Sequence, residues 1–419
     1  MKTTHYIIHF CTILCLGYFS CSPSGPAPIS PEEVVSTLQK RLIQAQEGET
    51  ILLPEGTFSF QRPLSLNDVP GITIKGAGKG KPFLSFKEQI EGAEGFAIKN
   101  VKSITLEGFT VADSKGDAIK IQASEDVIMR DLETTWTEGA LPTNGGYGLY
   151  PVHCTNVLME NCEASYAMDA GIYVGQSTNV IVRNNYVHHN VAGLEIENTR
   201  NGEVYENTAK FNTAGMLIFD MPDVPQANGY KIKFYNNVME DNNEPNFSAP
   251  GIVVNMLPPG TGMLLMAHTQ LEVYENTIKN HNTIGIALTS WLFNNRPFES
   301  EEYDPYCTEV YVHNNVIEEG GGPSDTSTDF GKLFTALFGG EKVDILVDGI
   351  FKPETLDESG NPTGICFQNN GEISFANLNA GKGPTPEAMM QNMDRDMSKF
   401  DCELAPVEVE DLGEWLLKD

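Results

Sequence analysis

Two glutamates two positions apart, Glu195 and Glu197, are the first candidates for chemistry, because they stand in the apolar stretch VAGLEIE. On a strand, residues i and i+2 point to the same side, so both carboxyl groups would face one way. Paired carboxyl groups serve as general acid and base in reactions at sugars. Tyr147 and His153, at the two ends of YGLYPVH, are a second candidate pair that could take up and return a proton. We therefore predict catalytic roles for these four residues, with solvated surface as the alternative for the carboxylates.

Residues able to hold a substrate occupy equivalent places in neighbouring stretches. Tyr150 and Tyr173 stand in GLYP and GIYV, and exposed aromatic rings are suited to stacking against sugar rings. The predicted substrate-binding residues are Lys120, Tyr150, Tyr173 and Asp220. The adjacent His188 and His189 are expected on a turn surface, because equivalent places elsewhere hold unrelated residues. A metal site is the alternative for this pair, although the sequence places no further ligands near it.

The elements that must position these side chains are repeats of 22 to 23 residues. One pattern reads DAGIYV (169–174), VAGLEI (191–196) and TAGMLI (213–218), and a second reads TNVLMENC, TNVIVRNN and RNGEVYEN. Apolar residues alternate within each stretch, which indicates strands rather than helices. Two or three short strands per repeat, separated by Gly and Asn, predict one coil of a parallel β-helix, with successive coils ~4.8 Å apart.

Such coils sort side chains into rows. The expected inward row is Leu149, Ile172, Leu194, Met216 and Ile252, which treats APGIVV (249–254) as a coil and residues 256–268 as an insertion. The expected outward row is Lys120, Tyr150, Tyr173, Glu195 and Leu217. The second pattern aligns Asn185, Asn207, Asn237, Asn276 and Asn315, then Asn190, Asn212 and Asn242, with Cys162 at the first place of its coil. Stacked Asn side chains satisfy turn backbone groups, so their predicted role is structural.

The N-terminal part of the chain fits a solenoid. Residues 31–48 predict an amphipathic helix with Val35, Leu38, Leu42 and Ile43 on one face, which would cover the open edge of the first coil. The following ILLPEGTF and ITIKGAG resemble the start of pectin-lyase-fold proteins, and the chain from about Asp68 to Asn315 resembles right-handed β-helix repeat proteins. The expected fold class is all-β: a right-handed parallel β-helix, a single-stranded solenoid with an N-terminal capping helix.

The stretch YGLYPVHCT (147–155) resembles the YG-x-DPH stretch of mannuronan C5-epimerases and related alginate lyases. In those enzymes a Tyr, an Asp and a His remove and return the C5 proton of a uronate. Tyr147 matches the family's Tyr, but Tyr150 replaces the Asp and Val152 replaces the His, with His153 one position later. The resemblance therefore carries over Tyr147, with His153 as a displaced partner.

The layout of the chain is also similar to a family of exported β-helix proteins with lipoprotein or ordinary signal peptides. Members of this family are often encoded beside a c-type cytochrome. This resemblance implies a cell-envelope location and a c-type cytochrome partner, and it supplies no catalytic residue. The chain has no CxxCH motif, so the sequence predicts no c-type haem of its own.

The first residues have the pattern of a targeting segment. Lys2 is followed by an apolar run from Tyr6 to Phe19, then by Ser20, Cys21 and SPSGPAP, and this run is too short to favour a spanning helix. We predict a lipoprotein signal peptide over residues 1–20, lipidation at Cys21 and a tether over 21–30, with an ordinary signal peptide as the alternative. The chain would then lie in the periplasm or at the outer membrane, bound to the membrane only through its lipid. The net charge of −30 argues against nucleic acid and anionic membrane as partners.

Five cysteines remain beyond the predicted signal and lipidation site: Cys154, Cys162, Cys307, Cys366 and Cys402. Export permits disulfides, and an odd number leaves at least one cysteine unpaired within the chain. We favour Cys366 with Cys402 because their surroundings are rich in loops, and the other pairings stay open. No cofactor is evident, since there is no CxxC or HExxH for zinc. Acidic side chains could ligate Ca²⁺, but no D-x-D-x-D-G loop supports such a site.

Beyond the tether, the expected organisation is a β-helix with its capping helix over 31–320, further irregular coils over 321–378 and a C-terminal cap or tail over 379–419. The predicted function is binding or processing of a polysaccharide on the outward face of the parallel strands, by an exported, lipid-anchored protein. The alternative is a non-catalytic scaffold of the cell envelope that partners a c-type cytochrome. Whether the chain is an enzyme stays open; the enzyme classes that fit are polysaccharide lyase, epimerase and glycoside hydrolase.

Overall fold

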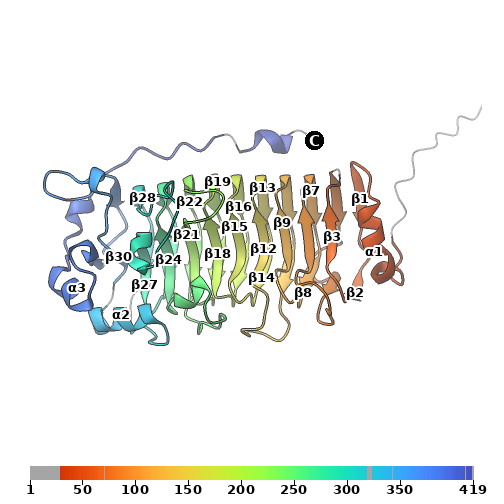
Figure 1. Cartoon of the computed structure of the whole chain (residues 1–419), viewed down its shortest axis with the longest axis horizontal. Helices are drawn as coiled ribbons and strands as arrows, with labels where there is room; N and C mark the ends of the chain where they lie inside the picture. The colour runs from red at the N-terminus through yellow and green to blue at the C-terminus, as the bar shows by residue number, and fades with distance from the viewer. Residues whose placement is uncertain (1–28, 70, 319–322, 342, 411, 418–419) are drawn as a thin grey trace, which may run out of the picture.

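The chain winds into stacked coils that form a long solenoid (Figure 1). The computed structural model describes residues 29–69, 71–318, 323–341, 343–410 and 412–417, so the predicted signal peptide, most of the predicted tether and Cys21 lie outside the described residues. In this part of the chain the strands form three sheets of 11, 10 and 11 strands, here called sheets A, B and C. Neighbouring strands within each sheet are parallel. The predicted parallel β-helix is therefore confirmed.

Each coil contributes a strand to each sheet over most of the solenoid. Sheet A consists of β1 (Glu49–Leu52), β4 (Ile72–Lys75), β7 (Lys102–Glu107), β10 (Glu125–Arg130), β13 (Thr155–Glu160), β16 (Thr178–Arg183), β19 (Arg200–Tyr205), β22 (Tyr230–Tyr235), β25 (Thr269–Tyr274), β28 (Thr308–His313) and β31 (Ile365–Gln368). Sheet B consists of β2 (Gly56–Ser59), β5 (Pro82–Ser85), β8 (Thr110–Ala112), β11 (Glu133–Thr135), β14 (Glu163–Ser165), β17 (Tyr186–His188), β20 (Thr208–Lys210), β23 (Val238–Glu240), β26 (Thr277–Lys279) and β29 (Val316–Glu318). Sheet C consists of β3 (Leu64–Asn67), β6 (Phe96–Lys99), β9 (Ile119–Gln122), β12 (Tyr147–Val152), β15 (Ala170–Gly175), β18 (Ala192–Glu197), β21 (Ala214–Phe219), β24 (Thr261–Met266), β27 (Ile284–Thr289), β30 (Ile345–Val347) and β32 (Phe375–Asn377).

The rows of sheet C follow the predicted alternation through β21. Leu149, Ile172, Leu194 and Met216 pair in register and lie in the main apolar core. On the outward side, Lys120 pairs with Tyr150, Tyr173 with Glu195, and Glu195 with Leu217. Because adjacent coils stack strand on strand, residues 22 to 30 apart in sequence become direct neighbours.

The sequence analysis predicted the wrong segment for the next strand of sheet C. APGIVV is not a strand of sheet C; Ile252 precedes a short 3₁₀ helix, η1 (Val253–Met256). The strand that pairs with β21 is β24, in which Met263 takes the inward place next to Met216. Both segments contain the same small-then-apolar pattern, so local sequence could not separate them. The expected inward position of Ile252 is therefore wrong, and 241–260 is the insertion.

Stacked asparagines line the turns of the solenoid, as predicted. The amide of Asn237 donates to the carbonyl of Val204 at 2.9 Å and to Asn276 Oδ1 at 3.0 Å. Its own Oδ1 accepts from the backbone and side chain of Asn207, both at 3.0 Å. In the second row, a Cβ on Gly171 would lie 2.7 Å from Asn190 Nδ2, which explains why the strands of sheet C carry Gly at this place. The asparagine rows therefore require a residue without a side chain at the neighbouring position of sheet C.

The helix α1 (Val34–Ile43) covers the first coil at one end of the solenoid (Figure 1). The predicted capping helix is confirmed, but its buried face is Val34, Leu38 and Leu42. Val35 and Ile43, which were expected to be buried, are 50% and 65% exposed. Both sets are compatible with helical spacing, and contact with the first coil decides between them.

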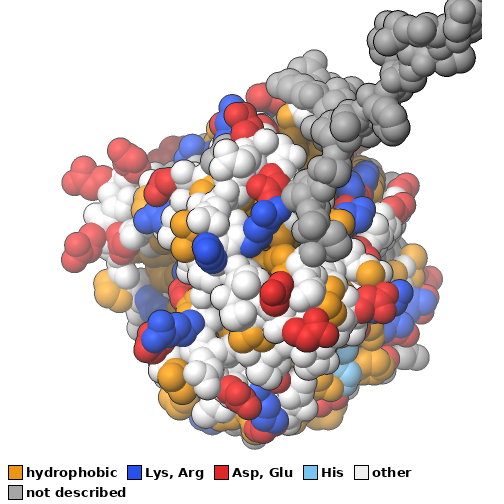
Figure 2. All heavy atoms as spheres, turned by 90° about the vertical axis from the view of Figure 1, so that its right-hand side faces the viewer, with side chains coloured by type: hydrophobic (Ala, Val, Ile, Leu, Met, Phe, Trp, Pro, Cys, Tyr) orange, Lys and Arg blue, Asp and Glu red, His pale blue; other side chains and the backbone are white. Residues whose placement is uncertain are grey.

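Figure 2 looks onto this end of the molecule. Side chains of both charge signs are interspersed there with uncharged and apolar ones. Beneath, the Gln39 side chain donates to the carbonyl of Ser65 at 3.0 Å and accepts from its N–H at 2.8 Å. Since β3 is the first strand of its sheet, this helix satisfies part of an otherwise open strand edge.

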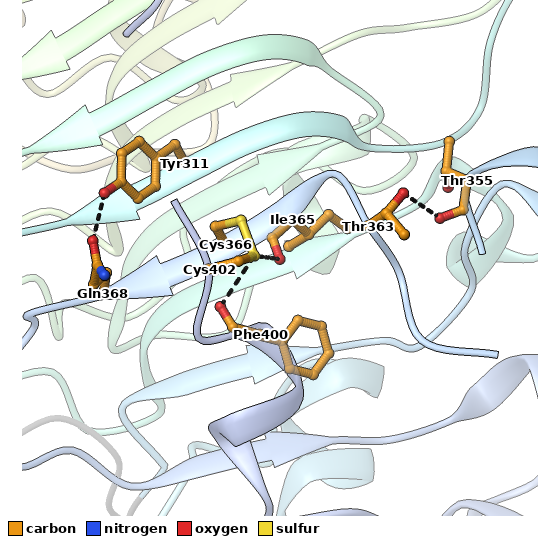
Figure 3. The surroundings of a disulfide bond; sticks show 8 residues. All are labelled: Tyr311, Thr355, Thr363, Ile365, Cys366, Gln368, Phe400 and Cys402. Atoms are coloured by element: carbon orange, nitrogen blue, oxygen red, sulfur yellow. Dashed lines mark hydrogen bonds between the residues drawn. A yellow bond between two sulfur atoms is a disulfide. The ribbon is translucent and has the colours of Figure 1, made fainter. Parts of the chain in front are cut away.

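The other end carries α2 (Asp329–Phe338) and α3 (Pro386–Asn392) (Figure 1). Short 3₁₀ helices are η2 (Trp291–Asn294), η3 (Pro353–Thr355), η4 (Ala380–Lys382), η5 (Met397–Phe400) and η6 (Glu414–Leu417). Cys366 on β31 forms a disulfide with Cys402, which confirms the favoured pairing (Figure 3). No helix among the described residues is long and apolar enough to cross a membrane.

After Cys402 the chain runs back along the outer face of sheet A (Figure 1). The N–H of Val407 donates to Glu272 Oε2 on β25 at 3.0 Å, and the N–H of Glu410 donates to Asn201 Oδ1 on β19 at 2.8 Å. Further along, Leu412 packs in one apolar cluster with Leu158 and Ile181, which lie on β13 and β16. The C-terminal tail thus crosses several coils on the outer face of sheet A. Other segments cover sheet C.

Candidate functional site

A cavity of about 350 Å³ lies on the outward face of sheet C. Its floor is formed by residues of β12, β15, β18, β21, β24 and β27. Its roof comes from residues 251–258, which include η1, and from η2 and α2. Glu195 and Tyr173 are consequently only 1% and 9% exposed. The predicted outward row is therefore partly covered at this point and lines a pocket.

One end of the cavity, which we call the acid end, is formed by Tyr147, Asp169, Tyr173 and Glu195. The ring centroids of Tyr147 and Tyr173 are 4.4 Å apart. The ring of Tyr150 lies 4.6 Å from that of Tyr147 and 5.2 Å from that of Tyr173. Three tyrosines from two adjacent coils therefore form one aromatic cluster beside two carboxyl groups.

The two carboxyl groups of the acid end favour their protonated forms. Burial raises the pKa of Glu195 well above its usual range, and the nearby carboxyl groups of Asp169 and Glu197 raise this pKa further. Burial also raises the pKa of Asp169, although a hydrogen bond with Tyr147 acts in the opposite direction. Within the described residues, Glu195 Oε1 and Asp169 Oδ1 have no hydrogen-bond partner. Each group therefore has one buried oxygen without a partner beside the cavity.

Glu197 flanks the acid end from the next outward position of β18. Burial raises its pKa to about 8, the carboxyl group of Asp220 adds to the shift, and hydrogen bonds with Gln176 and Tyr173 reduce it. The Gln176 amide donates to Glu197 Oε2 at 3.5 Å. The predicted pair Glu195 and Glu197 does share one face, but the cavity is lined by Glu195 and not by Glu197.

Lys120 and Tyr150 form a half-exposed edge next to the acid end. The ammonium of Lys120 lies 4.9 Å from the centroid of the Tyr150 ring and 3.4 Å from Asp117 Oδ2. Burial raises the pKa of the Tyr150 hydroxyl, so this hydroxyl stays neutral at physiological pH. These two predicted binding residues are thus placed where a ligand could contact both solvent and the tyrosine cluster.

Asp220 is buried and fully engaged in hydrogen bonds, so its predicted role in substrate binding is wrong. It is 1% exposed, and its Oδ1 forms a hydrogen bond with Nδ1 of the buried His268 at 2.9 Å. Its Oδ2 accepts from the N–H of Gly229 at 2.6 Å, and its carbonyl accepts from the Tyr303 hydroxyl at 2.8 Å. The carboxylate therefore anchors the loop that leaves β21.

His153 does not meet Tyr147, so the proposed proton-transfer pair is also wrong. His153 lies at the turn after β12 with a φ of 54°, and its Nε2 forms a hydrogen bond with Gln176 Oε1 at 2.9 Å. Tyr147 starts the same strand six positions earlier, roughly 20 Å away at ~3.3 Å per residue. The titratable neighbour of Tyr147 is Asp169 instead.

His188 and His189 lie on the turn surface, as predicted. Their Nδ1 atoms are 2.7 Å apart, and His188 Nε2 is 3.3 Å from Glu163 Oε1. The two imidazole rings pack among the aromatic rings of Tyr166, Tyr186 and Phe211. In the part of the chain that the structure describes, no group of three or more His, Cys, Asp or Glu side chains is placed to hold a metal ion.

Asp169 is the site residue that sequence reasoning missed. It occupies the place just before the outward strand of its coil, where the other coils carry Gly146, Val191, Thr213, Gly260 and Thr283. A single acidic residue in a row of small or uncharged ones was the available signal. Its importance becomes visible only with the roof in place, because burial is what shifts its pKa.

The chain is similar in sequence and in fold to known proteins. Residues 94–296 match the family described as right handed beta helix region. Together with the three parallel sheets, this match defines the class: the chain is a right-handed parallel β-helix protein. The pre-neck appendage protein of Bacillus phage phi29 is 26% identical over 238 residues, which cover 48% of this chain. The match spans only 27% of that relative's own length.

Two solved structures are similar at low identity. The A-module of the mannuronan C-5 epimerase from Azotobacter vinelandii is 14% identical, with 77% of this chain and 86% of that chain covered and a TM-score of 0.46. The catalytic unit of the α-1,3-glucanase from Streptomyces thermodiastaticus is 16% identical, with 78% and 48% covered and a TM-score of 0.45. Neither likeness transfers a residue role to this chain.

Proposed function

We propose that this chain binds a glycan at the acid end and transfers a proton to it from Glu195. The observation that carries the proposal is Glu195, whose side chain lines a cavity beside three tyrosines and whose buried Oε1 has no hydrogen-bond partner within the described residues. Leaving such an atom unpaired costs about 1–3 kcal/mol, a cost that a ligand hydroxyl or glycosidic oxygen would remove.

The electrostatics of the acid end suit general-acid catalysis. A carboxyl group whose pKa is raised well above its usual range holds its proton to higher pH, as a general acid requires. Asp169 holds the complementary position, because it contacts Tyr147 and lies within electrostatic reach of Glu195. Protonation of the oxygen of a glycosidic bond is the step these groups would promote, with the tyrosine rings packing against the sugar.

The test is product analysis on a panel of polysaccharides and oligosaccharides that includes uronates. Glu195→Gln should lower turnover by roughly 10²- to 10⁴-fold, because the amide keeps the shape and cannot donate the proton. The matched control is Glu203→Gln on sheet A, where the side chain is half-exposed, and its turnover should equal that of the wild type.

Equal rates for the wild type and Glu195→Gln on every glycan that is turned over would refute the role of Glu195. If the wild type neither binds nor turns over any glycan on the panel, the whole proposal fails. The alternative, a non-catalytic envelope scaffold that partners a c-type cytochrome, would then be tested by recovery of the cytochrome from envelope extracts.

We further propose that the chain is exported and held in the periplasm or at the outer membrane through a lipid on Cys21. The disulfide between Cys366 and Cys402 supports export, because such bonds persist in oxidising compartments. The mass of the mature N-terminal peptide checks this: a chain that begins at residue 21 with a lipid adduct supports it, and an unprocessed N-terminus contradicts it.

A further inference from the structure

The cavity has two chemically different halves. The rest of the lining, here called the apolar end, is mostly apolar and includes Leu217, Ile252, Met256, Leu264, Phe330 and Phe334. Thr261, Thr289 and Asn294 are the polar residues of this part of the lining. These residues come from the floor strands, from the segment 251–258 that contains η1, and from η2 and α2, so the roof and the floor are both mostly apolar there. The volume of about 350 Å³ is at the lower end of the ~300–1,000 Å³ usual for small-molecule sites.

A glycan alone does not fit this wall. Sugar rings carry hydroxyls on most of their carbons, and each hydroxyl buried without a partner costs about 1–3 kcal/mol. A hydrocarbon group in the same space gains about 0.8 kcal/mol for each methylene removed from water. Met221, Met256 and Met266 can adjust to a flexible chain, since methionine adapts its shape easily.

Charge also restricts the head group of the ligand. The residues that line the cavity include Asp169 and Glu195 but no Lys, Arg or His. A fatty-acid carboxylate or a phosphate would therefore meet carboxyl groups without a compensating cation among the lining residues, beside the buried Glu195. A neutral head that carries hydroxyls can instead accept from the protonated carboxyl groups and donate to their free oxygens.

We infer that the ligand is a neutral amphiphile: a sugar at the acid end that carries an alkyl or acyl chain into the apolar end. The identity of the sugar head rests on the proposed function, whereas the hydrocarbon chain rests on the lining of the apolar end. The polar and apolar ends belong to one continuous cavity, so a single molecule would contact both.

The experiment measures binding by titration calorimetry with methyl, butyl, hexyl and octyl glucosides below their micellar concentrations, together with octanoate and octan-1-ol. The affinity of the wild type should rise about fourfold for each added methylene. Leu264→Asn, which places an amide in the apolar end, should remove this dependence. Leu52→Asn is the matched control, because Leu52 is 43% exposed on β1, and it should keep the dependence. Circular dichroism of each variant checks that the solenoid is folded.

The outcomes separate the two proposals. An affinity that does not change with chain length overturns the hydrocarbon inference, whatever Glu195→Gln does. Tight binding of octanoate overturns the requirement for a neutral head. If octan-1-ol binds as tightly as octyl glucoside, the cavity takes a hydrocarbon but not a sugar, and the inference of a sugar-bearing ligand fails. Retained chain-length dependence in Leu264→Asn would show that the chains bind elsewhere and would overturn the site.

Discussion

Glu195, Asp169 and Glu197 have the same side-chain chemistry as the many acidic residues on the surface of this chain, yet burial gives them a different charge state. Burial raises the pKa of each of them, and neighbouring carboxyl groups raise it further. A group that prefers to be neutral in the folded chain binds its proton more tightly than in the unfolded chain. The stability of the protein must therefore depend on pH through these residues.

For Glu197 the sign and the range of this dependence can be worked out. Its pKa is about 8 in the folded chain and near 4.5 when unfolded, so between these values only the folded chain retains the proton. The stabilisation is complete below pH 4.5 and is lost as the pH rises toward 8, by up to ~1.4 kcal/mol per pH unit. Chemical denaturation of the wild type and Glu197→Gln from pH 5 to 8 should show a steeper fall for the wild type.

The control for this measurement is Glu203→Gln, which should follow the wild-type profile because the side chain is half-exposed. Parallel profiles for the wild type and Glu197→Gln would contradict a raised pKa at Glu197. They would also weaken the argument that the acid end holds protonated carboxyl groups, since the same burial acts on Glu195 and Asp169.

At the scale of the element, each coil is defined by its turn as much as by its strands. The strands bury their apolar rows in the core, while the turns carry backbone groups that must find partners away from water. The asparagine ladder supplies these partners coil after coil, from Asn185 through Asn207, Asn237, Asn276 and Asn315 to Asn370. Removing one asparagine of the ladder should therefore break hydrogen bonds to the coils on both sides of it.

Asn237→Ala tests the ladder. The change removes the acceptor for the backbone and side-chain N–H groups of Asn207 and the donor to the carbonyl of Val204. With about 1–3 kcal/mol for each buried group left unpaired, the free energy of unfolding should fall by roughly 3 kcal/mol. Asn282→Ala, at an exposed position, should stay within ~0.5 kcal/mol of the wild type in the same urea titration. Equal losses in both variants would show that the ladder has no special role.

At the scale of the whole molecule, the solenoid is closed by different means at its two ends. The helix α1 covers the first coil, whereas the last coils are followed by a disulfide and by a tail that returns along sheet A. Because stacked coils contact mainly their neighbours, loosening at an end can spread inward. The crosslink joins Cys402 to Cys366 on β31, the last strand of sheet A, where such loosening would begin.

Removing the disulfide with the double change Cys366→Ser and Cys402→Ser should lower the free energy of unfolding by about 4 kcal/mol, as expected for a closed loop of 36 residues. Reducing agent should lower the stability of the wild type by a similar amount and leave the double variant unchanged. The readout is denaturant unfolding with and without reductant. The remaining described cysteines are free and buried, so they offer the reductant no other disulfide. A reductant effect of equal size in both proteins would show that the loss of stability does not come from the Cys366–Cys402 bond.

Local sequence was sufficient for the repeated parts of this protein. Alternating apolar residues, small turn residues and aligned asparagines act within one coil or between adjacent coils, and each coil repeats the same solution. The fold class, the rows of β12 to β21, the ladder and the common face of Glu195 and Glu197 therefore follow from the chain alone. Ambiguity began where two segments had the same local pattern, as with APGIVV and TGMLLM, or where two helix faces were both compatible, as in α1.

Only the tertiary structure decided what covers the outward row. Phe330, Phe334 and Ile252 reach the same cavity as Tyr147 although they are more than a hundred residues away in sequence, and no local pattern predicts that meeting. The roof they help to form changes the charge state of Glu195 and Asp169, while the loop after β21 turns Asp220 into a structural anchor. The reason is physical: backbone conformation depends largely on nearby residues, whereas burial and pKa depend on everything that packs around a group.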